Sequence, residues 1–251
     1  MINLKFNIHM KIRILFVIIM LYVFCVKSSF GQDFTKFSIS GGPIIGWYVP
    51  SMEDLNKELN KLGIPEMSKS GFLNVGGGGF LIIPGLSKFR LGGIGYGFSS
   101  ETSAEFQNTI KTAKFSYSGA AISLEYFEKI SKKFDVSFGG LIGYGTLGLN
   151  IAKYPKDYKN WNITPFVNDS LLSNQILIND YTKKILTLQP QISIGYDMLK
   201  FLYLKVSAGY CFSVSGKWKL NNVLEVNNIP SGIKADGFSF TLGIQAGLFV
   251  K

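Results

Sequence analysis

The chain of 251 residues has 28 Gly and 14% aromatic but only 17% charged residues, and its length suits one domain of ordinary size. The formal net charge is +10, yet the basic residues are spread out with no dense Lys/Arg run, which argues against nucleic-acid binding. Beyond residue 31 no apolar run approaches the roughly 20 residues of a transmembrane helix. A membrane location of the mature chain would therefore require β-strands.

The N-terminal segment 1–31 has the order of an export signal. A basic start, an apolar stretch and a small-residue cleavage site follow one another: Lys5, Lys11 and Arg13; residues 14–26; and Ser29-Phe30-Gly31. We predict cleavage before Gln32, export from the cytoplasm and a mature domain of residues 32–251. The mature chain keeps 22 basic and 16 acidic residues, a net charge of +6.

Eight segments have the composition and alternation of strands: 34–47, 72–83, 88–99, 113–127, 133–149, 184–198, 201–215 and 236–250. Each is long for a soluble strand and suits a tilted membrane crossing. The connections alternate between long (48–71, 100–112, 150–183, 216–235) and short (84–87, 128–132, 199–200). Transmembrane barrels have this asymmetry, and with eight strands both termini lie on the side of the short turns.

The first long connection contains a predicted helix at 51–62. Ser51 and Asp54 resemble a capping box at its start, and Gly63 ends it. Its apolar residues share one stripe. We expect this helix to pack on the rim of a barrel, with a lid or partner-binding helix as the alternative.

The last strand shows the two environments most clearly. One face is apolar and the other is small and neutral: Phe238, Phe240, Leu242, Ile244, Ala246, Leu248 and Val250 against Ser239, Thr241, Gly243, Gln245 and Gly247. A long apolar face suits lipid, and small neutral residues suit a narrow interior. The predicted fold is therefore all-β: a single up-and-down antiparallel transmembrane barrel of eight strands. Periodicity alone does not say which face is inside.

Aromatic residues collect near the predicted strand ends, as in the interfacial girdles of membrane barrels. They are Phe34, Phe37, Trp47, Tyr48, Phe72, Phe80, Phe115, Tyr117, Tyr126, Phe127, Tyr196, Phe201, Tyr203, Phe238 and Phe249. We predict two girdles, with ordinary core aromatics as the alternative.

Six charged residues near the short-turn ends of strands form the candidate site: Lys36, Arg90, Glu125, Asp135, Asp197 and Lys205. Five lie on the predicted lumen face, and Arg90 joins them only if Gly92-Gly93 carries a bulge. Because charges buried in a narrow barrel must pair, we predict an ion-pair network that fills the lumen. The alternative is six unrelated charges solvated near the turns.

The composition argues against several catalytic classes. His9, the only histidine, leaves with the signal, as does Cys25, so the mature chain keeps Cys211 and no His. Triads that need His are then excluded, as is an internal disulfide, and the commonest zinc ligand is absent. The G-x-G-x-x-G match at 143–148 lies inside a strand with no helix after it, which excludes a dinucleotide site. We expect no enzymatic activity, cofactor or metal.

The signal, the alternation, the loop asymmetry and the end Phe249-Val250-Lys251 resemble the small eight-stranded outer-membrane barrels of the OmpA/OmpX type. The resemblance covers about residues 33–251. It implies the outer membrane of a Gram-negative-type bacterium, with outer-membrane lipid and the barrel-assembly machinery as partners. Members of this class are mostly non-enzymatic and serve in envelope integrity, adhesion or small-solute passage.

Our leading hypothesis is a non-enzymatic integral outer-membrane protein with a side-chain-filled lumen, whose long loops contact an extracellular ligand or protein. One alternative is a soluble periplasmic or secreted barrel that binds an apolar ligand. Others are a small-solute channel and a membrane hydrolase that uses carboxylates alone, such as Asp169 or Asp180.

Overall fold

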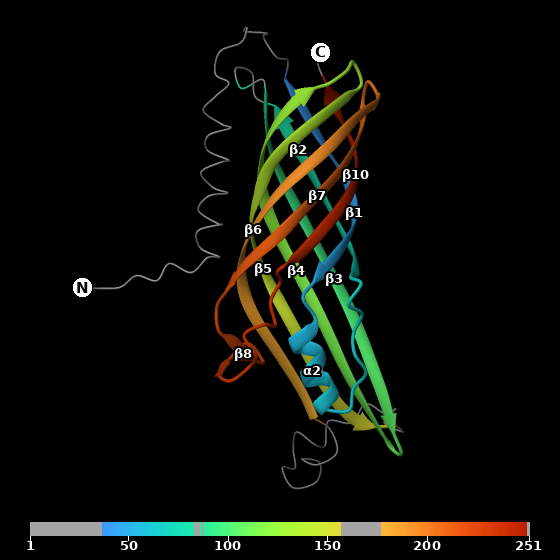
Figure 1. Cartoon of the computed structure of the whole chain (residues 1–251), viewed down its shortest axis with the longest axis vertical. Coiled ribbons are helices and arrows are strands. Elements are labelled where there is room, and N and C mark those ends of the chain that lie inside the picture. Colours follow the sequence, from blue (N-terminus) through green and yellow to red (C-terminus); the bar gives the residue numbers. More distant parts are fainter. Residues whose placement is uncertain (1–36, 83–85, 87, 157–176, 250–251) are drawn as a thin grey trace, which may run out of the picture. The chain divides into compact units, whose positions relative to one another are not determined.

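The computed structural model describes residues 37–82, 86, 88–156 and 177–249, and these form a closed antiparallel barrel (Figure 1). Its eight strands are β1 (Ser38–Pro50), β2 (Phe72–Ile82), β3 (Phe89–Phe106), β4 (Thr109–Lys129), β5 (Phe134–Pro155), β6 (Leu177–Leu199), β7 (Leu202–Ser215) and β10 (Gly237–Phe249). Each strand pairs with its sequence neighbour, and β1 pairs with β10 to close the barrel. The predicted all-β, eight-stranded fold is confirmed.

Three further elements lie at the end of the barrel that carries the long connections. The helix α2 (Glu53–Lys61) follows β1, and a short hairpin of β8 (Trp218–Leu220) and β9 (Leu224–Val226) adds to β6. We call this the loop end and the opposite one, where β1 begins and β10 ends, the turn end (Figure 1). Within the described ranges, no helix is long and apolar enough to cross a membrane.

The outer surface of the barrel is apolar. On β10, Phe238 and Ile244 are exposed, whereas Ser239 and Gln245 are buried inside. The apolar face therefore points outward, opposite to the arrangement that a soluble barrel with an apolar ligand in its lumen requires. On β5 the exposed apolar stretch runs from Phe134 to Tyr144. That length matches one tilted transmembrane strand, about 9–11 residues.

Outward aromatic side chains gather at two levels. Towards the loop end, Tyr210 contacts Phe212 and Phe238 at centroid distances of 4.8 and 4.9 Å. Towards the turn end, Phe134 lies 4.8 Å from Tyr196. Many of the aromatic residues predicted for the girdles nevertheless point inward and are buried, so that part of the prediction is wrong: Tyr48, Phe72, Phe80, Phe115, Tyr117, Phe127 and Tyr203. At a strand end, side chains on the outer face lie at the membrane interface and side chains on the inner face lie in the core. The position of an aromatic residue along the strand therefore does not show which of the two faces it occupies.

Four neighbouring strands continue beyond the apolar surface at the loop end. β3 and β4 pair from Phe89 and Tyr126 as far as Phe106 and Thr109, where Gln107 and Asn108 form the turn. The predicted loop 100–112 is therefore wrong, as is much of 150–183, because β5 and β6 also continue. Above the apolar surface these strands lack a continuous apolar face, so the alternation that marks the other strands is absent there. We call this projecting part of β3–β6 the wall.

The register of β3 corrects the expectation that a bulge at Gly92-Gly93 is needed to turn Arg90 inward. Its pairing with β2 and β4 is continuous through Gly92 and Gly93, without a bulge. Arg90 faces the lumen all the same, because Ile94, Tyr96 and Phe98 share its face. In a narrow barrel the bulky side chains of this strand fill the interior.

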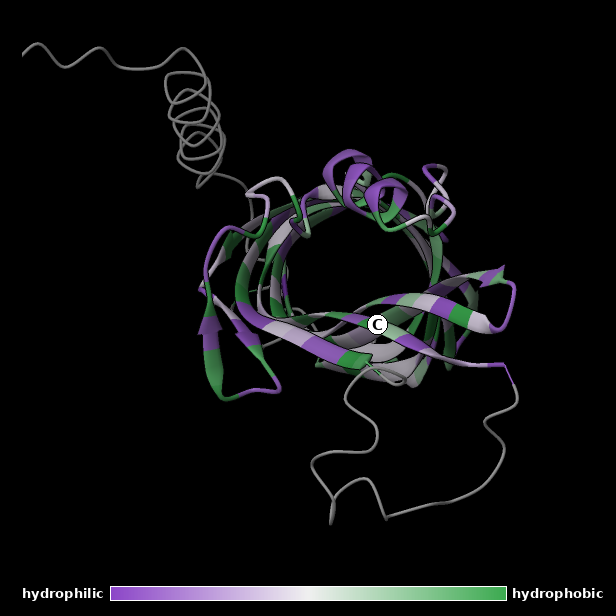
Figure 2. Cartoon of the chain, turned by 90° about the horizontal axis from the view of Figure 1, so that it is seen from below, coloured by the Kyte–Doolittle hydropathy of each residue, from purple (hydrophilic) through white to green (hydrophobic). Residues whose placement is uncertain are grey.

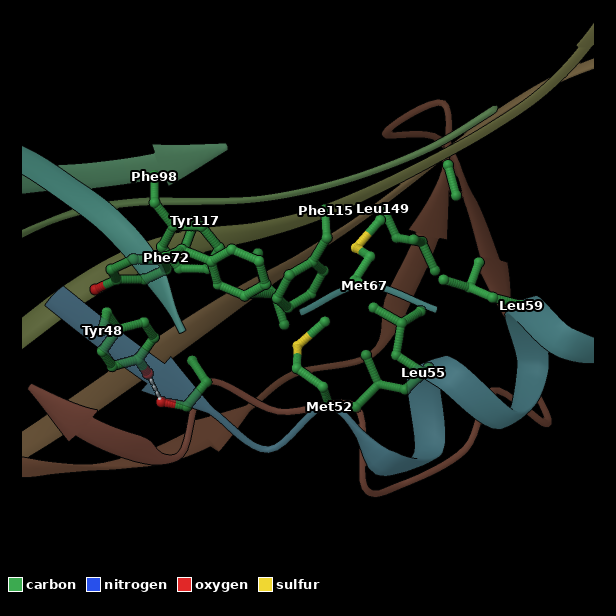
Figure 3. Close-up of a cluster of buried hydrophobic side chains, with 14 of the residues drawn as sticks. Tyr48, Met52, Leu55, Leu59, Met67, Phe72, Phe98, Phe115, Tyr117 and Leu149 are labelled. Atoms are coloured by element: carbon green, nitrogen blue, oxygen red, sulfur yellow. Dashed lines mark hydrogen bonds between the residues drawn. The ribbon is translucent and has the colours of Figure 1, made fainter. Parts of the chain in front are cut away.

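The helix α2 packs on the inner side of the wall (Figure 3). Its Leu55 and Leu59 are fully buried beside Phe115 and Leu149. The predicted capping box does not form, since the helix begins after Met52 without a side-chain cap. The Ser51 amide instead donates to the Asp236 carbonyl oxygen. Gly63 ends the helix as predicted, with φ of 69°.

Candidate functional site in the barrel lumen

The inward side chains form three levels along the barrel, whose ribbon outline is seen end-on in Figure 2. The charged tier lies near the turn end and consists of Arg90, Glu125, Asp135, Tyr203 and Lys205. The polar middle consists of Asn74, Gln189, Gln191, Ser239 and Thr241. The aromatic tier lies near the loop end and consists of Tyr48, Phe72, Phe98 and Tyr117.

Arg90 and Asp135 form a bidentate ion pair in the charged tier. The guanidinium Nη1 and Nη2 atoms each donate to one carboxylate oxygen of Asp135 at 2.9 Å. The Tyr203 hydroxyl donates to Asp135 Oδ1 at 2.9 Å and accepts from Arg90 Nη1 at 2.7 Å. Asp135 is completely buried and Arg90 is 3% exposed. Two parallel charge-assisted hydrogen bonds compensate the desolvation of both charges.

Aromatic rings surround the Arg90 guanidinium. Its central carbon lies 4.6, 4.1 and 5.0 Å from the ring centroids of Phe80, Phe127 and Tyr203. A planar guanidinium stacks well on aromatic faces, which a lysine ammonium does less effectively. These rings fill the cross-section of the lumen around the ion pair.

The second pair of the charged tier joins Glu125 to Lys205. Lys205 Nζ donates to Glu125 Oε1. The same oxygen accepts from Gln191 Nε2 at 2.7 Å, and Oε2 accepts from Ser137 Oγ at 3.1 Å. Both carboxylate oxygens are thus hydrogen-bonded, as a buried charge requires.

The structure brings four of the six candidate residues together: Arg90, Glu125, Asp135 and Lys205. Asp197 lies opposite Tyr203 in the β6–β7 register, and its carboxylate pairs with the half-exposed Lys129 at 2.6 Å. Lys36 lies outside the described residues. Sequence reasoning missed Tyr203 and Gln191, because it selected charged residues only. Both residues fall on the alternate positions of β7 and β6 that face the lumen, and this alternation could have identified them.

The aromatic tier closes the lumen towards the loop end. Phe72 stacks on Phe98 at 5.1 Å with an interplanar angle of 7°, and Tyr48 lies 5.5 Å from Phe98. The Tyr48 hydroxyl donates to the Ala235 carbonyl oxygen, drawn as a dashed line in Figure 3. Above these rings, Met52 and α2 complete a continuous apolar core.

Of the two candidate carboxylates for hydrolysis, the structure describes one. Asp180 lies on β6 in the wall, and Asp169 lies outside the described residues. Among the residues that the structure describes, no group of three or more His, Cys, Asp or Glu side chains is placed to hold a metal ion. In the charged tier, both carboxylates already form hydrogen-bonded ion pairs with cations.

Comparison with known proteins finds solved structures of low sequence identity. No protein-family model matches the sequence, and no curated protein matches it. Among solved structures, the Yersinia pestis attachment invasion locus protein Ail, in complex with the heparin analogue sucrose octasulfate, is 12% identical, with 84% of this chain and 95% of that chain covered and a TM-score of 0.41. A major outer membrane protein from Thermus thermophilus is 10% identical, with 85% and 100% covered and a TM-score of 0.45. The Escherichia coli outer membrane protease OmpT is 10% identical, with 86% and 97% covered and a TM-score of 0.22.

The chain has the fold of the small outer-membrane β-barrels. The closed eight-stranded sheet and the exposed apolar surface of transmembrane length carry this conclusion. In a barrel of this size side chains fill the interior, and here they do so with the charged and aromatic tiers.

Proposed function

We propose that this protein is a non-enzymatic, non-conducting barrel of the outer membrane, which holds a structured surface for envelope or extracellular contacts. The observation that supports this most is the closure of the lumen by two different tiers. Arg90–Asp135 and Glu125–Lys205 fill it near the turn end, and stacked aromatic rings fill it near the loop end. Neither tier leaves reactive groups arranged as a nucleophile and a base.

The loop end supplies the surface for contacts. The wall, α2 and the β8–β9 hairpin extend beyond the apolar outer surface and share one cluster of buried apolar side chains. With the turn end in the periplasm, this end faces the outside. Outer-membrane lipid contacts the apolar outer surface, and the barrel-assembly machinery inserts the chain into the membrane. The partner of the loop end is an extracellular ligand or protein.

Fractionation and conductance test this proposal together. The exported protein should partition with outer membranes and show heat-modifiable mobility on gels. After reconstitution into planar bilayers, the unmodified protein should give no steady conductance. Large steady conductance would contradict the proposal in favour of a small-solute channel, and turnover of lipid, peptide or ester substrates would contradict its non-enzymatic part.

A further inference from the structure

The polar middle of the lumen has unfilled space. One cavity of about 20 Å³ is lined by Asn74, Gln189 and Ser239, among others. A second, of about 40 Å³, reaches the Glu125–Lys205 pair. Both are lined by Gln191 and Thr241, so the two cavities are neighbours. A water molecule needs roughly 10–15 Å³ of such space, and the two cavities are therefore large enough for about one and about three waters.

Asn74 points to what occupies this space. Its side chain is 4% exposed, and its Oδ1 atom has no hydrogen-bond partner in the protein. A buried amide oxygen without a partner loses the hydrogen bonds to water that it makes in the unfolded chain, which destabilises the folded protein. The residue lines the first cavity beside the amide-bearing Gln189 and Gln191. The lining is mixed, since Ile44, Ile94 and Leu141 share it with five polar side chains. A buried water needs about two to four polar partners, and Asn74, Gln189, Gln191, Ser239 and Thr241 are the groups that could supply them.

We propose that the polar middle is a closed binding site for ordered water. Water donates to Asn74 Oδ1 and bridges it to the neighbouring amides and hydroxyls, and further water in the second cavity reaches the Glu125–Lys205 pair. The charged tier separates this site from the turn end and the aromatic tier separates it from the loop end. The proposal rests on the proposed function only for this closure, because an open channel would contain exchanging water.

Asn74→Leu should change the stability in opposite directions for a wet and a dry site, and Asn74→Ser serves as its companion variant. With water bound, Asn74→Leu displaces it and leaves the surrounding amides unpaired, so the midpoint of the heat-induced mobility shift should fall by about 2–6 °C. Asn74→Ser makes room for another water and should change the midpoint by less than Asn74→Leu does. In a dry site, Asn74→Leu fills a void and removes the unpaired oxygen, so the midpoint should rise, whereas Asn74→Ser enlarges the void and should lower it.

A crystal structure of the unmodified protein gives an independent readout. Density for a water within hydrogen-bond distance of Asn74 Oδ1 is expected. An unchanged or raised midpoint for Asn74→Leu, or an Asn74 side chain that is hydrogen-bonded to protein alone, would overturn the proposal. Conductance of the unmodified protein would instead overturn the closed barrel, so the two failures are distinguishable.

Discussion

Arg90 and Glu125 occupy directly opposed positions on β3 and β4. Each nevertheless forms its ion pair with a residue of another strand. Arg90 binds Asp135 of β5, and Glu125 binds Lys205 of β7. The opposed pair therefore connects two ion pairs, one from β3 to β5 and one from β4 to β7, instead of neutralising itself between the paired strands β3 and β4. This arrangement makes the charged tier a cross-barrel element, and its removal should affect the whole barrel.

Asp135→Ala should lower the free energy of unfolding by about 3–5 kcal/mol, because it leaves the Arg90 charge buried without its carboxylate. Urea titration of the protein in detergent, followed by gel mobility, measures this. Lys88→Ala is the matched control, since Lys88 forms an exposed pair with Glu128 at 2.9 Å and exposed pairs contribute about 0–1 kcal/mol. Equal effects of the two substitutions would show that the charged tier is solvated.

The double substitution Arg90→Ser with Asp135→Ser should not create a steady conductance. It removes both charges together, so no uncompensated charge remains, and the aromatic tier still closes the lumen above it. Planar-bilayer recording of the variant beside the unmodified protein measures this. A stable open current in the double variant alone would mean that the aromatic tier is not a seal.

Lys183 should give the stability a pH dependence in the alkaline range. It lies on the loop-end side of Leu186, where the alternating series of exposed apolar residues Leu186, Leu188, Ile192 and Ile194 begins, and is therefore outside the membrane-spanning segment. Burial, followed by the nearby Lys234 charge, lowers the pKa of Lys183 to about 8, against the opposing effect of Asp236. Its Nζ donates to the Ile233 carbonyl oxygen at 2.5 Å.

The sign of this dependence follows from the lowered pKa. Between about pH 8 and the ordinary lysine value of 10.5, the unfolded chain binds more protons at this position than the folded protein. Stability should therefore rise with pH across this window. Lys183→Met should remove that part of the rise, and Lys184→Met, at the exposed neighbour, should retain it. Equal pH profiles for unfolding of the unmodified protein and Lys183→Met would contradict the prediction.

The mature protein should begin at Gln32, because residues 1–31 follow the basic, apolar and small-residue order of an export signal. N-terminal sequencing of the exported protein measures this. Retention of residues 14–26 in the membrane-inserted protein would show an uncleaved segment instead.

The strand number and the closed barrel were predictable from local pattern. Alternation such as that of Phe238 to Val250 places neighbouring side chains on opposite faces whatever the rest of the chain does, and it identified all eight strands. It did not identify residues 100–106 of β3 and 109–112 of β4, because these residues show no alternation of apolar and polar side chains. It also did not distinguish Trp47, which faces outward, from Tyr48, which lies in the core.

The sequence by itself determined that charges of both signs near the turns would need partners, since burial without pairing is too costly. Only the tertiary structure decided the partners. Asp135 and Tyr203 meet across a separation of 68 residues, and Asp197 pairs with Lys129 across the same separation. The physical reason is that a side chain's reach across a barrel depends on register and on the angle between strands, and neither is contained in the periodicity of any one strand. The unpartnered oxygen of Asn74, likewise, is a property of the space that β2 shares with five other strands.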